Sequence, residues 1–239
     1  MTTPPSTSTT RSSRALVLLG GQVVEIGTLA GLPAPDLVVA ADSGLDLAHH
    51  LGITVDVAVG DFDSVSPDAL ARAEDEGVRI QRHPAAKNAT DFELALELVL
   101  HEGAASATVV GGGGGRLDHL LANALVMASE RFSALDLVAV DGDARLYVVR
   151  RPTPISGTVG ELASLLAVNG PAEGVRTSGM LYPLVGERLE PGSSRGVSNQ
   201  LTDPVAEVGI DAGVLLAVLP GPEQRIERPP STRSGGSPP

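Results

Sequence analysis

Short apolar runs alternate with amphipathic segments from Arg14 to about Val149. The apolar runs have the length of buried strands and include ALVLLGG, LVVAADSG, VDVAVGDFDS and ATVVGG. The segments between them repeat their apolar positions as helices do, in LDLAHHLG, PDALARAEDEG and RLDHLLANALVMASE. Strands and helices in this order predict an α/β fold with a doubly wound, Rossmann-like parallel sheet over residues 14–150.

The pattern changes after the segment RPTPISG. Strands and turns follow in ELASLLAVN, GVRTSGMLYPLV and VAEVGIDAGVLLAVLPG, and IDAGV has a glycine-bearing turn of the kind that closes hairpins. We therefore predict a smaller all-β sandwich domain over residues 151–221. Residues 1–13 are polar and proline-rich, residues 222–239 are rich in Pro, Ser, Gly and Arg, and both are predicted to be disordered tails.

Composition excludes several classes of function. The chain has 239 residues, 42% of them hydrophobic, which supports well-packed cores. A net charge of −12 and a pI near 4.7 argue against nucleic-acid binding, which requires a basic surface. The chain has no cysteine, which excludes disulfides, thiolate zinc sites and a cysteine nucleophile. We expect no signal peptide and no membrane span, so the cytoplasm is the default compartment.

Acidic residues follow several of the predicted strands. Asp42 follows LVVAA, Asp61 and Asp63 follow VDVAVG, and Asp118 follows the glycine run, while Asp91 follows a segment that is less clearly a strand. The carboxyl ends of parallel strands share one edge, where ligands bind. Carboxylates that converge there without cationic partners repel each other and favour a divalent cation. The leading hypothesis is therefore Mg²⁺-dependent phosphate chemistry.

The GDFDS segment has two possible explanations. Asp61 and Asp63 are two positions apart, so their side chains would share a face in an extended strand or bracket one ion in a tight turn. Alternatively, the segment is an acidic turn in which Ser64 and Pro67 cap the next helix.

The KNATDFELALELVL segment combines a helix start with candidate chemistry. Thr90 and Glu93 have the spacing of a capping box, which gives them a structural role. Asp91 favours the helix dipole and also stands at the mouth of the predicted crevice. Lys87 is the one lysine in a chain with sixteen arginines, and its place near Asp91 favours a phosphate contact over a surface role.

The GGGGGRLDH segment lies between a predicted strand and a helix. Backbone amides at such a helix start can bind phosphates, although the GK[ST] ending of a P-loop is missing and the glycines could form a flexible turn. Arg116 suits phosphate oxygens, and Asp118 adds to the acidic residues. For His119 we favour a capping or packing role.

The motifs together resemble those of thiamine pyrophosphokinases. The resemblance covers about residues 15–220 and rests on their combination and order: ADSG, GDFDS, KNATDFELAL, GGRLDHLLAN, RTSGMLYPL and GVSN. It implies transfer of the pyrophosphoryl group from ATP to the hydroxyl of thiamine, with release of AMP. Mapped by motif, Asp61, Asp63 and Asp91 would hold Mg²⁺, and Asp42 and Asp118 would complete the acidic site.

The resemblance also implies how the two substrates bind. Lys87, Arg116 and Asn123 would contact ATP. Thr177, Ser198 and Asn199 would bind thiamine across a homodimer interface. Asp42 and Asp118 are both candidates for the base that accepts the hydroxyl proton. The chain has no tryptophan, so an aromatic partner for thiamine would be one of Phe62, Phe92, Phe132, Tyr147 and Tyr182.

Three alternatives remain open at this point. The substrate could be another heterocyclic alcohol, such as a pterin. The DxDx[TV]-like GDFDSV could begin a haloacid-dehalogenase-type phosphatase in which Asp61 is the nucleophile. Finally, the chain could be a sensor that binds nucleotide or thiamine without turnover.

Overall fold

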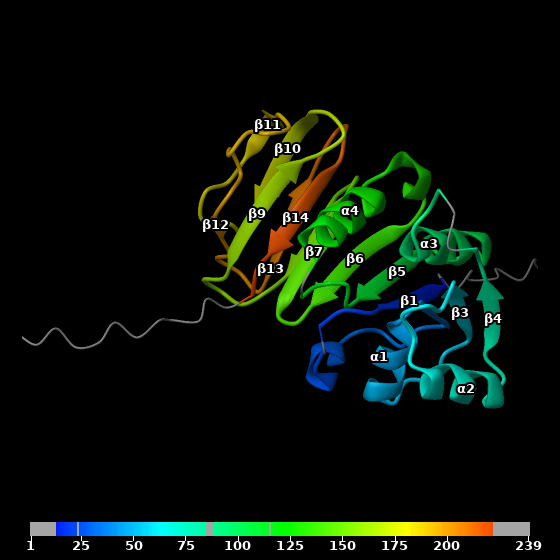
Figure 1. The fold of residues 1–239 in the computed structure, drawn as a ribbon. Helices are drawn as coiled ribbons and strands as arrows, with labels where there is room; N and C mark the ends of the chain where they lie inside the picture. The colour runs from blue at the N-terminus through cyan, green and yellow to red at the C-terminus, as the bar shows by residue number, and fades with distance from the viewer. Residues whose placement is uncertain (1–12, 23, 85–87, 115, 222–239) are drawn as a thin grey trace, which may run out of the picture.

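The computed structural model describes residues 13–22, 24–84, 88–114 and 116–221. Within them the strands form two sheets, a ten-stranded sheet in the order β12-β9-β14-β7-β6-β5-β1-β2-β3-β4 and a four-stranded sheet in the order β11-β10-β13-β8 (Figure 1). In the large sheet, β6, β5, β1, β2, β3 and β4 pair in parallel, whereas β7, β14, β9 and β12 pair antiparallel.

The elements have the following bounds. The helices are α1 (Gly44–Leu51), α2 (Pro67–Asp75), α3 (Asp91–His101) and α4 (Leu117–Met127), with short 3₁₀ turns at η1 (Ile26–Leu29) and η2 (Glu130–Phe132). The strands of the large sheet are β1 (Arg14–Leu19), β2 (Leu37–Ala41), β3 (Val57–Gly60), β4 (Arg79–Arg82), β5 (Ser106–Val110), β6 (Asp136–Asp141), β7 (Ala144–Val149), β9 (Leu162–Ala167), β12 (Asn199–Gln200) and β14 (Leu215–Leu219). The strands of the small sheet are β8 (Thr153–Ser156), β10 (Ala172–Ser178), β11 (Val185–Leu189) and β13 (Val205–Gly209).

The central parallel strands β1, β2 and β3 are buried on both faces. Along β1, Val17 and Leu19 face a core that includes residues of α3 and α4, whereas Leu16 and Leu18 face a core that includes residues of α1 and α2. Figure 1 shows these helix pairs on opposite sides of the sheet. A strand covered on both faces has no polar alternation, which is why these segments read as continuous apolar runs.

One predicted helix start is confirmed, and the other lies two residues later than predicted. Thr90 is the N-cap of α3, and its side-chain oxygen accepts a hydrogen bond from the backbone N–H of Glu93 at 3.2 Å. The cap of α2 is Ser66, not Ser64, with Pro67 in the first helical turn. The Ser64 hydroxyl instead donates to Asp63 at 2.9 Å. Ser64 therefore does not cap α2 and lies beside the acidic residues that follow β3.

The large sheet continues past residue 150, where the sequence pattern changes. β14 pairs with β7 on one side and with β9 on the other, so strands from the C-terminal region extend the first sheet. The four-stranded sheet packs on this antiparallel end through a core that includes Leu165 and Leu215 from the large sheet and Val175 and Val208 from the small one. The structure confirms a mixed α/β fold with a separate antiparallel sheet. The Rossmann-like and sandwich descriptions and the domain boundaries stay predictions, and both predicted tails, apart from residue 13, lie outside the described residues.

The predicted turn at IDAGV does not close a hairpin. β13 belongs to the small sheet and β14 to the large one, so the segment between them carries the chain from one sheet to the other. Gly213 has a φ of +90°, and a Cβ at this position would lie 2.4 Å from the carbonyl oxygen of Pro171. Glycine is needed for this close crossing, which local turn chemistry does not distinguish from a hairpin.

Because Leu215 joins the two sheets and is fully buried, we expect Leu215→Ala to lower the free energy of unfolding by about 2–5 kcal/mol. The matched control is Leu181→Ala, a half-exposed leucine for which we expect a loss below about 1 kcal/mol. Urea unfolding measures both. Equal losses in the two variants would contradict the proposed role of β14 in joining the sheets.

Candidate active site

Three carboxylates converge where neighbouring parallel strands end. Asp42 follows β2, and Asp61 and Asp63 follow β3. One carboxylate oxygen from each of them lies within 4.8 Å of the others. The prediction that these strand ends bring acids together is therefore confirmed for Asp42, Asp61 and Asp63.

Asp91, at the first position of α3, lies beside this group. A Cβ at Gly60 would be 3.2 Å from the Asp91 Oδ1 and 3.3 Å from the Asp42 Cα, so Gly60 lets the two acids approach the end of β3 together. We refer to Asp42, Asp61, Asp63 and Asp91 as the acidic group.

The backbone around the acidic group is held in unusual conformations. Asp42 has a φ of 47° and Phe62 a φ of 64°, both in the left-handed region that non-glycine residues seldom adopt. Phe62 is buried, and the Arg82 guanidinium lies 5.2 Å from the centre of its ring. This buried ring anchors the turn that carries Asp61 and Asp63 on either side of it. Such strain, of order 1–3 kcal/mol per residue, tends to occur at functional sites.

Asp42 has the most perturbed environment of the four acids. Burial raises the pKa of its carboxyl, and the charges of Asp91 and Asp61 raise it further, against hydrogen bonds from the Ser43 backbone and the Ser64 side chain. Its Oδ1 is buried without a hydrogen-bond partner in the part of the chain that the structure describes. A hard divalent cation such as Mg²⁺ prefers carboxylate oxygens and would relieve this repulsion, so the donor set fits that ion.

Asp42 and Asp91 of the acidic group line a crevice of about 380 Å³. Two glycine loops form much of its wall, and backbone hydrogen bonds join them, from Gly112 N to Gly20 O at 3.1 Å and from Gln22 N to Gly113 O at 3.0 Å. A Cβ at Gly21 would lie 2.5 Å from the Gly113 oxygen, so a side chain there would separate the loops. The crevice is lined by Leu19, Gly20, Gly21, Ala41, Asp42, Ser43, Ser64, Thr90, Asp91, Phe92, Gly112, Gly113, Gly114, Arg116, His119 and Asn123.

Asp118 does not join the acidic group. It forms an ion pair with Arg116 at 2.6 Å, and the Arg116 guanidinium lowers the pKa of Asp118 to about 2. Both side chains are about two-thirds exposed. Arg116 and Asn123 do line the crevice near Asp42 and Asp91, as their predicted nucleotide contacts require. The predicted phosphate contact Lys87 lies outside the described residues.

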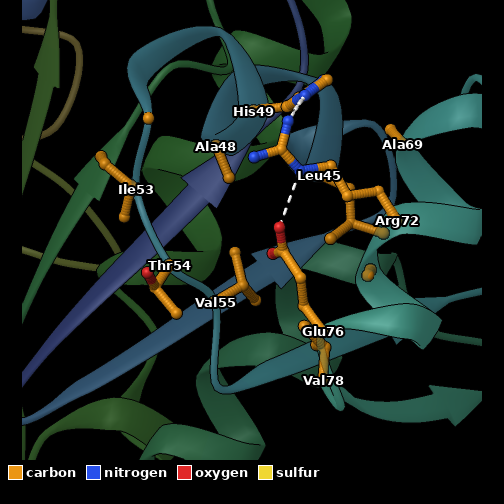
Figure 2. A pocket seen from close by; sticks show the side chains of 12 residues that line it. Leu45, Ala48, His49, Ile53, Thr54, Val55, Ala69, Arg72, Glu76 and Val78 are labelled. Carbon is orange, nitrogen blue, oxygen red and sulfur yellow. Dashed lines mark hydrogen bonds and ion pairs between the residues drawn. The ribbon is translucent and has the colours of Figure 1, made fainter.

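A second cavity of similar volume lies between α1 and α2 (Figure 2). Its walls are mostly apolar, and its polar groups include the Arg72–Glu76 ion pair at 2.7 Å and the contact of Arg72 with His49. These side chains satisfy one another, so this cavity offers less chemistry than the crevice at the acidic group.

Two of the three predicted thiamine contacts bind the backbone of their own chain. The Thr177 hydroxyl accepts a hydrogen bond from Leu184 N at 2.9 Å. The buried Asn199 side chain accepts from Tyr182 N at 3.0 Å and donates to Tyr182 O at 2.7 Å. Ser198 is exposed, with a left-handed φ of 58°. Thr177 and Asn199 therefore shape the loop that precedes β11.

The families "Thiamin pyrophosphokinase, catalytic domain" and "Thiamin pyrophosphokinase, vitamin B1 binding domain" match residues 32–139 and 154–215, respectively. The chain belongs to the thiamin pyrophosphokinase family. Thiamine diphosphokinase activity follows from this membership. The enzyme forms thiamine diphosphate from thiamine, with ATP as co-substrate. The comparisons do not support a pterin-specific enzyme, a phosphatase or a sensor.

Relatives of known structure share the fold. The thiamine pyrophosphokinase of Bacillus subtilis is 24% identical over 185 residues, which are 76% of this chain and 86% of the relative. The crystal structure of thiamine pyrophosphokinase from Bacillus subtilis matches with a TM-score of 0.76 and 22% identity over 88% of this chain and 100% of that one. Thiamin pyrophosphokinase from Candida albicans matches with a TM-score of 0.71 and 17% identity over 87% and 89%. Among the described helices of this pyrophosphokinase, none has both the length and the apolar character of a membrane span.

Two glycines at the site were not predicted as functional. Gly20 and Gly21 line the crevice, and the only signal for them was the glycine pair after the first apolar run. Tyr182, one of the five candidate aromatic partners for thiamine, is 62% exposed, whereas Phe62, Phe92 and Phe132 are buried and Tyr147 is half-buried, so its ring is the most accessible of the five. In the sequence, Tyr182 is marked by its place within the motif RTSGMLYPL.

Because folding raises the pKa of Asp42, ionisation of this carboxyl opposes folding. Asp42→Asn removes the charge, and asparagine tolerates the positive φ at this position. At neutral pH and without divalent cations, we expect this variant to raise the free energy of unfolding by about 0.5–2 kcal/mol. The gain should disappear below about pH 3.9, where the wild-type carboxyl is protonated in both states. Urea unfolding across this pH range measures it.

The control is Asp46→Asn. The two Asp46 oxygens accept hydrogen bonds from the backbone and the hydroxyl of Ser66 at the start of α2, and asparagine keeps one acceptor oxygen. This variant should lower the free energy of unfolding by about 1 kcal/mol. Destabilisation by Asp42→Asn at neutral pH would contradict the repulsion argument.

Proposed function

We propose that the crevice beside the acidic group binds ATP and that the thiamine hydroxyl attacks the β-phosphorus, so that AMP leaves. The observation that carries this proposal is that Asp42, Asp91 and two glycine loops line the same crevice, while Asp61 and Asp63 converge on Asp42. Pyrophosphoryl transfer depends on positioning and on neutralisation of charge, and needs no covalent residue. Because ATP is the co-substrate, we place the reaction in the cytoplasm.

Asp61, Asp63 and Asp91 are the proposed Mg²⁺ ligands. Asp61 and Asp63 belong to the group of converging oxygens, and the charge of Asp91 acts on the same site. When bound, Mg²⁺ would neutralise the charge of the ATP phosphates. Without a cation the same carboxylates would repel the nucleotide, because the chain itself carries a net charge of −12.

Asp42 is the better candidate for the proton acceptor. Its raised pKa brings it closer to the pH at which a base works well, and it lines the crevice. Asp118 is a poorer base, since Arg116 lowers its pKa to about 2. The different surroundings of Asp42 and Asp118 therefore favour Asp42 as the proposed base.

Arg116, Asn123 and backbone amides of the glycine loop are the proposed phosphate contacts. Arg116 precedes α4, so its guanidinium and the first amides of the helix are on the same side of the crevice as Gly112–Gly114. The ion pair with Asp118 is exposed, so the guanidinium can exchange this partner for a phosphate at small cost. Lys87 remains a proposed phosphate contact from the sequence.

The thiamine site is proposed to lie around Tyr182 and Ser198, with Thr177 and Asn199 holding the loop. The exposed tyrosine ring offers an aromatic face to a cationic heterocycle. The residues that line the crevice all come from the range 19–123, outside the vitamin B1 binding region at 154–215. A second copy of the chain could bring this region to the crevice, which supports a homodimer.

The exposed apolar residues of α4 are the proposed dimer surface. Leu117, Leu120, Leu121 and Leu125 are 45–69% exposed, and an apolar cavity of about 320 Å³ lies between α4 and the sheet. This cavity shares Gly112 and Asn123 with the crevice, so a second copy seated on it would reach the ATP site. Exposed apolar patches of this kind mark interaction sites.

We expect Asp61→Asn and Asp91→Asn each to lower the turnover of ATP with thiamine and Mg²⁺ by at least about 100-fold, because phosphate charge would be left without compensation. The control is Asp68→Asn, an exposed acid in the first turn of α2 that should keep full activity. The assay measures AMP and thiamine diphosphate. Near-full activity of either site variant would contradict the metal assignment.

For the dimer, we expect Leu121→Arg to halve the molar mass measured by light scattering at micromolar concentration, since a charge would be buried in an apolar interface. Ile26→Arg is the control, because Ile26 is 67% exposed in η1, away from α4. A wild-type protein that is monomeric, or a Leu121→Arg variant that keeps the wild-type mass, would exclude this surface.

A further inference from the structure

Helix α4 has little core packing of its own. Of its residues, Met127 alone is buried, although the helix supplies Asn123 and His119 to the crevice and follows Arg116. Most of its first two turns is exposed. Within a single chain, the orientation of α4 must therefore be set largely at its C-terminal end.

Two side chains from other elements, Arg150 and Asn169, hold that end, and we refer to them as the clamp. The Arg150 guanidinium, just after β7, donates through Nη2 to two carbonyl oxygens, both at 2.7 Å, those of Ala128, the C-cap residue of α4, and Ser129, the N-cap residue of η2. Asn169, after β9, donates through Nδ2 to the same Ala128 oxygen at 2.8 Å. The last carbonyls of a helix have no partners within the helix, and a cation there also complements the helix dipole.

Burying the charged Arg150 guanidinium to hold the end of α4 costs stability. Its side chain is only 17% exposed, and burial lowers the pKa of its guanidinium. Its Nε is buried without a hydrogen-bond partner among the described residues, and the nearest acid, Glu130, is 3.7 Å from Nη1. Water could satisfy the carbonyls of an exposed helix end at smaller cost than a buried charge. A requirement for fixed geometry explains the arginine better than a requirement for stability.

We propose that Arg150, assisted by Asn169, is a positioning residue that sets the orientation of α4 and thereby keeps Arg116, His119 and Asn123 at the crevice. The inference rests on the proposed nucleotide site. The helix has 11 residues, a length of about 16 Å, so a tilt of about 5° at the clamp would move the crevice end by roughly 1.4 Å. Misplacement of binding groups by about 1 Å is enough to lower reactivity strongly.

The test compares Arg150→Met with the wild type by calorimetric titration of a non-hydrolysable ATP analogue with Mg²⁺, and by steady-state kinetics. We expect the affinity for the analogue to fall, and the KM for ATP to rise, by about tenfold or more. A merely structural role would lower the active fraction, which reduces kcat and leaves the KM for ATP unchanged. That second pattern would overturn the proposal.

Matched variants sharpen this comparison. Arg151→Met removes the same charge from the next residue, whose exposed side chain pairs with Asp136, and should leave the KM for ATP unchanged. Arg150→Lys, which keeps the charge without the planar fork, should have an intermediate KM for ATP. If Arg150→Met fails to fold, Asn169→Gly removes one side chain of the clamp and keeps the φ of 60°, and it should weaken analogue binding in the same direction. Unchanged analogue binding in folded Asn169→Gly and Arg150→Lys would then overturn the proposal.

The titration separates this inference from the proposed function, because it requires no turnover. A wild-type protein that binds the analogue but does not convert thiamine would contradict the proposed function, while the comparison of Arg150 variants would still decide the role of the clamp.

Discussion

Repulsion between carboxylates at the ends of β2 and β3 is the constraint on which the rest of the site depends. Asp42, Asp61 and Asp63 present oxygens within 4.8 Å of one another, and Asp91 adds its charge beside Gly60. Burial and these charges raise the pKa of Asp42, so the apoprotein carries an unfavourable charge arrangement that a divalent cation would relieve. The left-handed backbone at Asp42 and Phe62 adds strain at the same place. Stability is thus given up at the site where charge must be bound.

The scaffold around the acidic group explains how this strain persists. The parallel strands are covered on both faces by helices, and the buried ring of Phe62 fixes the turn between Asp61 and Asp63. The glycine loops approach closely enough to bond through their backbones, which leaves a crevice instead of a side-chain-filled edge. On the far side of the crevice, α4 is fixed less by packing than by hydrogen bonds from Arg150 and Asn169 to the carbonyls that directly follow it, those of Ala128 and Ser129. One wall of the site is therefore rigid through its core, and the other through a polar clamp.

Much of this arrangement could be predicted from local sequence. The apolar runs that become β1, β2, β3 and β5 are continuous because both faces of each strand are buried, and the acids that follow β2 and β3 meet because parallel strands end at one edge. Which partner a side chain chooses could not be predicted. Asp118 pairs with Arg116 two positions away, Asn199 binds the backbone of Tyr182, and β14 joins the large sheet instead of closing a hairpin with β13. These outcomes depend on segments that are distant in sequence or on competition between nearby charges, which local patterns do not encode.

The most direct test of this account follows the β-phosphorus of ATP. The purified protein is incubated with Mg²⁺ and ATP radiolabelled at that atom, with thiamine, without it, or with a pterin alcohol in its place. We predict label in thiamine diphosphate and an equal amount of unlabelled AMP, only when thiamine is present. Label that stays in ADP, or transfer to the pterin alcohol but not to thiamine, would contradict pyrophosphoryl transfer to thiamine at this acidic crevice.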